Sequence, residues 1–168
     1  MKKLNFQRIA KHLLTGTSSL RKAFPPLSLH AIESAIKESE AAHQGQIRFV
    51  IECALDSAAL FAGQTARARA IEVFAQLGVW DTEHNNGVLI YVLLADRDVE
   101  IVADRGIDRQ TPTDTWRQIC RVMEAAFKQA HYEDGAVKGI QAVGRHLMAH
   151  YPATGENKNE LPDQPVIL

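Results

Sequence analysis

The feature that most constrains this chain is the apolar run Gly87–Ala95 (GVLIYVLLA), which is closely followed by a second β-prone run, Val99–Ala103 (VEIVA). A nearly unbroken run of branched apolar residues is typical of a strand buried on both faces. Asp96 and Arg97 lie between the two runs and favour a tight turn there. The sequence therefore predicts an antiparallel hairpin at the centre of the fold.

Polar loops precede and follow this hairpin. If Asp96–Arg97 forms the turn, Ala95 pairs with Asp98 and Gly87 pairs with Gly106, and displacing the turn by one residue moves each pair by two. In either register the two loops meet at one end of the sheet. They carry the carboxylates and amides of Asp81, Glu83, Asn85, Asn86, Asp104 and Asp108.

Carboxylate and amide oxygens are the ligands that hard cations such as Ca²⁺ and Mg²⁺ prefer. We therefore expect a divalent-cation site with Asp81, Glu83, Asn86, Asp104 and Asp108 as ligands. The alternative is a pair of solvated polar loops, because surface loops are commonly polar.

Three further side chains in these loops bear on chemistry. His84 can act as a proton donor or as a ligand. Arg105 and Arg109 either hold a phosphate group through the guanidinium fork or neutralise the neighbouring carboxylates. No nucleophile elbow, phosphate-binding glycine loop or HExxH pattern occurs in the sequence.

Length and composition limit the remaining possibilities. The 168 residues suffice for one domain with a substantial core. The formal net charge of −1 gives no reason to expect a nucleic-acid partner. The sequence has no apolar run long enough for a transmembrane helix and no signal-peptide pattern, so we expect a cytoplasmic protein.

The elements outside the hairpin predict an α/β fold. Helices are expected over 4–14, 29–43, 65–77, a stretch after Pro112, and 136–150, with a first strand over 46–55. The order ααβαββαα is compatible with a three-layer α/β/α sandwich around a small mixed sheet. We divide the chain into a basic N-terminal arm (1–27), a main domain (28–150) and a disordered C-terminal tail (151–168).

The arm is the second functional candidate. Residues 1–30 contain six Lys and Arg residues and no Asp or Glu, and Phe6, Ile9 and Leu13 lie at helical spacing. This pattern suits docking to a protein or to an anionic membrane surface. The alternative is that the apolar stripe covers the protein's own core.

Three short motifs resemble the TPM domain family. They are Asn85–Leu89 (NNGVL), Asp96–Arg97 and Asp104–Asp108 (DRGID), and the surrounding helices and strands agree over about residues 28–150. The chain is most similar to the short bacterial branch, which lacks the signal peptide and membrane anchor. Asn85 replaces the family's usual Asp, and Asp104–Arg105 replaces the more common Gly-Tyr pair.

The resemblance implies an α/β/α sandwich and a carboxylate-rich loop site for Ca²⁺ or a similar cation. It also allows weak phosphatase activity, since a plant thylakoid-lumen relative is described as an acid phosphatase. In that role Arg105 holds phosphate and His84 protonates the leaving oxygen. The alternative function is a non-enzymatic interaction module, because other relatives appear to be assembly or interaction modules.

Overall fold

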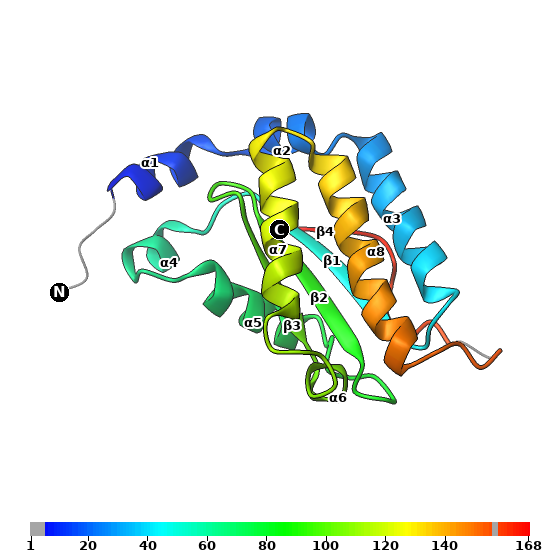
Figure 1. The fold of residues 1–168 in the computed structure, drawn as a ribbon. Coiled ribbons are helices and arrows are strands. Elements are labelled where there is room, and N and C mark those ends of the chain that lie inside the picture. The colour runs from blue at the N-terminus through cyan, green and yellow to red at the C-terminus, as the bar shows by residue number, and fades with distance from the viewer. Residues whose placement is uncertain (1–5, 156–157) are drawn as a thin grey trace.

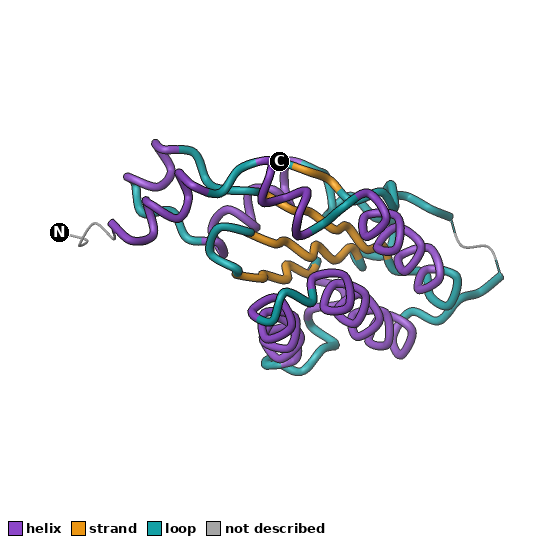
Figure 2. The backbone as a smooth tube through the Cα atoms, turned by 90° about the horizontal axis from the view of Figure 1, so that it is seen from above, coloured by secondary structure: helices purple, strands orange, loops and turns teal. Residues whose placement is uncertain are grey.

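The computed structural model describes residues 6–155 and 158–168, and its centre is a four-stranded mixed sheet in the order β3-β2-β1-β4. The strands are β1 (Gln46–Glu52), β2 (Gly87–Leu93), β3 (Asp98–Ala103) and β4 (Val166–Ile167). Strand β1 runs parallel to β2 and β4, and β3 runs antiparallel to β2. Helices lie on both sides of this sheet (Figures 1 and 2). The expected α/β/α sandwich is confirmed.

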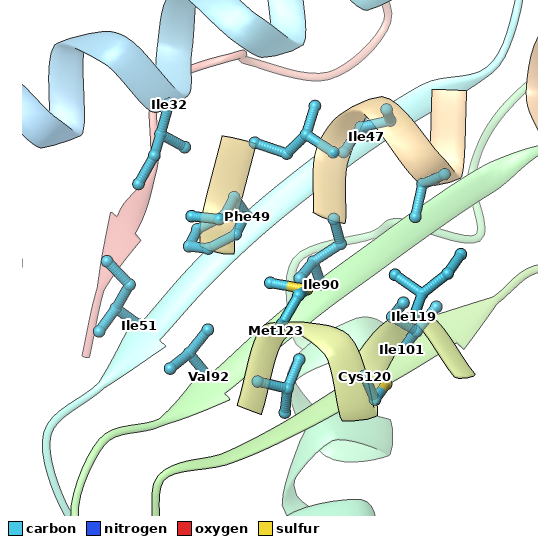
Figure 3. Close-up of a cluster of buried hydrophobic side chains, with 14 of the residues drawn as sticks. Ile32, Ile47, Phe49, Ile51, Ile90, Val92, Ile101, Ile119, Cys120 and Met123 are labelled. Atoms are coloured by element: carbon cyan, nitrogen blue, oxygen red, sulfur yellow. The ribbon is translucent and has the colours of Figure 1, made fainter. Parts of the chain in front are cut away.

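One face of the sheet is covered by three long helices, α3 (Pro26–Glu40), α7 (Thr115–Lys128) and α8 (Tyr132–His150). Alternate residues of β1 and β2 point into this layer, including Phe49 and Ile90, which are fully buried (Figure 3). This alternation follows from the two-residue period of a strand.

The opposite face is covered mainly by α5 (Ala66–Gln76). Helical spacing places Ile71, Phe74 and Leu77 on one apolar side of this segment, but Ile71 is exposed. The buried positions are instead Ala66, Ala70 and Val73, at i, i+4 and i+7. Their small side chains allow the helix to pack closely on the sheet.

The remaining helices are shorter. They are α1 (Phe6–Leu14), α2 (Thr17–Ala23), α4 (Ser57–Phe61) and α6 (Arg105–Asp108). Residues 4–5 of the first predicted helix lie outside the described residues. Helix α3 begins earlier than expected, at Pro26, because proline is favoured in the first helical turn. Leu20, Ala23 and Phe24 already belong to the main core, so part of the arm packs with the domain.

The predicted hairpin is present with a different turn. Leu93 pairs with Asp98, and Val88 pairs with Ala103, so every pair is displaced by two positions from the Asp96–Arg97 register. The turn contains four residues, and Arg97 has a positive φ of 52°. Leu94 and Ala95 are not part of β2, but their backbone N–H groups donate to the carbonyl oxygens of Glu52, the last residue of β1, and of Cys53.

The expectation of a disordered tail is wrong for residues 158–168. Strand β4 pairs with β1, and the backbone N–H of Leu168 donates to the carbonyl oxygen of Ile51 (3.0 Å). Leu161 is buried in the second core, and its N–H donates to Gln46 Oε1 (2.9 Å). This mostly polar segment contains four aliphatic residues, Leu161, Val166, Ile167 and Leu168, and β4 covers the edge of β1 that does not pair with β2.

Candidate functional site

The two polar loops meet at the end of the hairpin, as antiparallel pairing predicts. The N–H of Asp104 donates to the carbonyl oxygen of Gly87 (2.8 Å), and the N–H of Ile107 donates to that of Asn85 (3.3 Å). A Cβ atom on Gly106 would lie 2.4 Å from the Asn85 carbonyl oxygen and 2.8 Å from that of His84. Glycine at 106 therefore permits the close approach of the two loops.

Asn86 is the fully buried member of the predicted ligand set. Its Nδ2 donates to the carbonyl oxygen of Gln44 (3.2 Å), and its backbone N–H donates to Thr82 Oγ1 (3.1 Å). Its Oδ1 is buried and has no hydrogen-bond partner. Asn85, immediately before it, adopts a positive φ of 51°, which asparagine tolerates better than most residues.

Asp104 is also buried, at the start of α6. Its Oδ1 accepts a hydrogen bond from the N–H of Arg105 (2.7 Å), whereas its Oδ2 is buried without a partner. Across the described chain, only one other buried side-chain nitrogen or oxygen, His12 Nε2, has no hydrogen-bond partner. His12 Nε2 lies 3.1 Å from Asp96 Oδ1 and therefore has a charged neighbour. Asn86 Oδ1 and Asp104 Oδ2 are the two remaining buried atoms, and both belong to the predicted loops.

The other predicted ligands are exposed on the rim. The Glu83 backbone N–H donates to the carboxylate of Glu160 (3.1 Å), and Asp108 Oδ1 accepts from Trp116 Nε1 (3.1 Å). Asp81 is exposed in the loop before β2. Over residues 6–155 and 158–168, no three His, Cys, Asp or Glu side chains are grouped so as to hold a metal ion. The two buried oxygens, one amide and one carboxylate, are nevertheless suitable donors for a hard cation.

The predicted catalytic residues lie in the same loops. His84 and Arg105 are both exposed. Within the described residues, neither Arg105 nor Arg109 forms an ion pair, so neither guanidinium is engaged by a neighbouring carboxylate at contact distance.

Two residues beside the site were not singled out from the sequence. Tyr151 hydroxyl accepts a hydrogen bond from Gln110 Nε2 (3.0 Å) and would lie 2.9 Å from a Cβ on Gly106. Burial raises the pKa of Tyr151, and the negative charge of Asp104 raises it further. Tyr151 is the first residue of the predicted tail, and no local sequence pattern indicates that the end of α8 returns to the hairpin loops.

The fold and these loops define a class of small α/β/α domain in which a polar site lies at the open end of a central hairpin. The family model described as the TPM domain matches residues 21–146. The chain therefore belongs to the TPM domain family, which confirms the resemblance seen in the sequence motifs.

Solved structures show the same fold. The BA42 protein from the psychrophilic bacterium Bizionia argentinensis is 30% identical, with a TM-score of 0.75, and the match covers 84% of this chain and 93% of that one. An N-terminal domain from P. gingivalis is 18% identical over 89% of this chain and 94% of that one, with a TM-score of 0.61. The N-terminal domain of the cg2496 protein from Corynebacterium glutamicum is 17% identical over 73% of this chain and 72% of that one, with a TM-score of 0.52. No curated protein sequence matches the chain.

Proposed function

We propose that this TPM domain binds a divalent cation, Ca²⁺ or Mg²⁺, between the loop preceding β2 and the loop following β3. The observation that carries the proposal is that Asn86 Oδ1 and Asp104 Oδ2, two buried oxygens without partners, come from these two loops. A buried oxygen without a partner costs free energy, and a bound cation would offset that cost.

The ligand set has a buried centre and an exposed rim. Asn86 and Asp104 supply the central oxygens, and Asp81, Glu83 and Asp108 are the rim residues that supply further ligands. Because the rim side chains are exposed and must be ordered when the ion arrives, we expect modest affinity. Asn85 contributes no formal charge where the family usually has Asp, which weakens binding further.

We propose weak phosphatase activity as the finer function of the same site. A bound cation would polarise a phosphoryl oxygen or lower the pKa of a bound water. Arg105 would donate two hydrogen bonds to the phosphate, and His84 would protonate the leaving oxygen. The free guanidinium of Arg105 and the exposure of His84 support these roles, since both side chains are accessible to a substrate.

Calorimetric titration with Ca²⁺ and with Mg²⁺ tests the cation site. We expect a saturable transition in the wild-type protein and a reduction in affinity of about tenfold or more in Asp104→Asn, which removes one ligand charge. Glu38→Gln is the matched control, because it removes one charge from the exposed face of α3. Equal affinity in both variants, or no transition in the wild type at millimolar ion (about 1 mM and above), would overturn the proposal.

Hydrolysis of para-nitrophenyl phosphate, with and without the cation, tests the finer function. We expect cation-dependent turnover that falls in Arg105→Gln and is retained in Arg121→Gln, which removes an exposed arginine of α7. Cation binding without turnover would contradict the phosphatase role and leave a cation-binding interaction module.

A further inference from the structure

Helix α1 is oriented with polar side chains toward the domain. Arg8 donates to Asp96 Oδ2 (2.9 Å) and to the carbonyl oxygen of Gln64 (2.8 Å). His12 is buried, and its Nδ1 accepts a hydrogen bond from the N–H of Leu55 (3.0 Å). These contacts attach α1 to the hairpin turn and to the segment after β1.

The apolar side of the same helix points outward. Phe6 is 75% exposed, Leu13 74% and Leu14 84%. A surface helix ordinarily buries its apolar stripe and exposes its polar residues, and α1 does the reverse. The expectation that the stripe covers the protein's own core is therefore wrong for Phe6 and Leu13. Ion pairing of Arg8 with Asp96 fixes the opposite face against the domain.

Basic and apolar side chains continue from α1 onto the neighbouring elements. Leu14, Lys11 and Lys22 line one open cavity of about 1130 Å³, and Asp96, Glu133 and Asp134 line it as well. Leu27, at the start of α3, is 83% exposed. Within the described part of the chain, Lys11, Arg21 and Lys22 take part in no ion pair. We use the name arm surface for the exposed apolar side chains, and the basic side chains without an ion pair among the described residues, on α1, α2 and the start of α3: Phe6, Lys11, Leu13, Leu14, Arg21, Lys22 and Leu27.

We infer that the arm surface docks on the face of an anionic lipid bilayer, with α1 lying parallel to the membrane. Exposed leucine and phenylalanine side chains enter the boundary between headgroups and acyl chains, while lysine and arginine contact the anionic headgroups. The charge distribution favours an anionic membrane as the partner. Residues 1–30 contain six Lys and Arg residues and no acid, whereas the rest of the chain contains 13 basic and 20 acidic residues. A second copy of the chain would place like charges opposite one another, which disfavours self-association.

Co-sedimentation of the full chain with vesicles tests this inference. The vesicles contain phosphatidylcholine with about one third phosphatidylglycerol, and pure phosphatidylcholine vesicles provide the neutral comparison. We expect binding to the anionic vesicles, weakened as salt rises from about 0.05 M to about 0.5 M, and little binding to the neutral ones. The double variant Leu13→Ser/Leu14→Ser should bind at least about tenfold more weakly, because it removes the inserted apolar side chains.

Two control variants distinguish binding through the arm surface from nonspecific adsorption to vesicles. Val122→Ser removes an apolar side chain of α7 that is 61% exposed, and it should bind like the wild type. Lys11→Gln/Lys22→Gln should weaken binding to the anionic vesicles, whereas Arg121→Gln/Arg145→Gln, on α7 and α8, should not. Circular dichroism and the thermal midpoint establish that each variant is folded.

Three results would overturn the inference. The first is the absence of wild-type binding to anionic vesicles. The second is equal binding to neutral and anionic vesicles. The third is a concentration-dependent dimer, detected by sedimentation velocity without lipid, that Leu13→Ser/Leu14→Ser abolishes, since the arm surface would then cover a second copy.

Discussion

Two buried polar regions of this domain differ in how completely their oxygens are partnered. In the first region, Glu52 accepts hydrogen bonds from the Tyr91 hydroxyl (2.6 Å) and from Arg69 Nε (2.9 and 3.2 Å to its two oxygens). In the second region, Asn86 Oδ1 and Asp104 Oδ2 are buried without partners. Both regions lie beside the central strands, yet only in the first do both carboxylate oxygens have hydrogen-bond partners.

The difference indicates which region is structural and which is open to a ligand. A fully partnered buried network stabilises one arrangement of its side chains, and burial together with the Glu52 hydrogen bond raises the pKa of Tyr91 well above its ordinary value. An unpartnered buried oxygen costs stability, and folded proteins retain few of them. We therefore expect substitutions in the first region to affect folding and those in the second to affect binding.

Replacing Glu52 by alanine should have the largest effect on stability. The change leaves the Tyr91 hydroxyl buried and Arg69 without its main partner, so we expect the free energy of unfolding to fall by about 3–5 kcal/mol. Urea denaturation measures this loss. Glu72→Ala is the matched control, because Glu72 also pairs with Arg69 (3.3 Å) but is half exposed, and it should cost less than about 1 kcal/mol. Equal losses would contradict the structural role that we assign to the buried network around Glu52.

The central fold follows from the sequence because its signals are strong and local. The apolar run of β2 requires burial on both faces, and the hairpin then brings the two polar loops together in any register. The three motifs that resemble the TPM domain family lie in this hairpin and its two loops. Thus the position of the candidate site, between Asn85 and Gly106, was predictable from periodicity and pairing alone.

The details that failed depend on contacts between distant segments. The sequence did not predict that Asp108 Oδ1 accepts a hydrogen bond from Trp116 on α7. The tail was expected to be disordered, but Leu161 and β4 pack against residues more than a hundred positions earlier. The burial of Asn86 depends on Gln44, and the outward stripe of α1 depends on Arg8 and Asp96. No local periodicity encodes such pairs.

Glu40 is intermediate between the two regions, because it is a buried carboxyl that has a hydrogen-bond partner but also a like charge nearby. Its Oε1 accepts from the N–H of Ile47 (2.7 Å), and burial, reinforced by Asp163, raises its pKa from 4.5 to about 8. Between these values the folded protein holds a proton that the unfolded chain has lost. The free energy of unfolding contributed by Glu40 is therefore fully present below pH 4.5 and lost as pH rises toward 8.

Glu40→Gln should remove this pH dependence while keeping the oxygen that accepts from Ile47. We expect the variant to match the wild type near pH 5 and to exceed it by about 1–2 kcal/mol near pH 9. Urea denaturation at both pH values provides the measurement, and Glu38→Gln on the exposed side of α3 is the control. Parallel pH profiles for wild type and Glu40→Gln would show that Glu40 does not titrate in this range.

Asp104→Asn should have the smallest effect on the stability of the protein without cation. Asparagine retains the Oδ1 that accepts from the N–H of Arg105, and it removes the buried negative charge whose Oδ2 has no partner. We therefore expect a free energy of unfolding within about 0.5 kcal/mol of the wild type, or higher by up to about 1 kcal/mol. Added Ca²⁺ should then separate the two proteins, because a ligand that binds the folded state raises the thermal midpoint of the wild type and leaves that of the variant almost unchanged. Thermal unfolding with and without Ca²⁺ measures both effects. A loss of about 2 kcal/mol or more in the cation-free variant would mean that Asp104 stabilises the fold as Glu52 does, and the contrast between the two regions would fail.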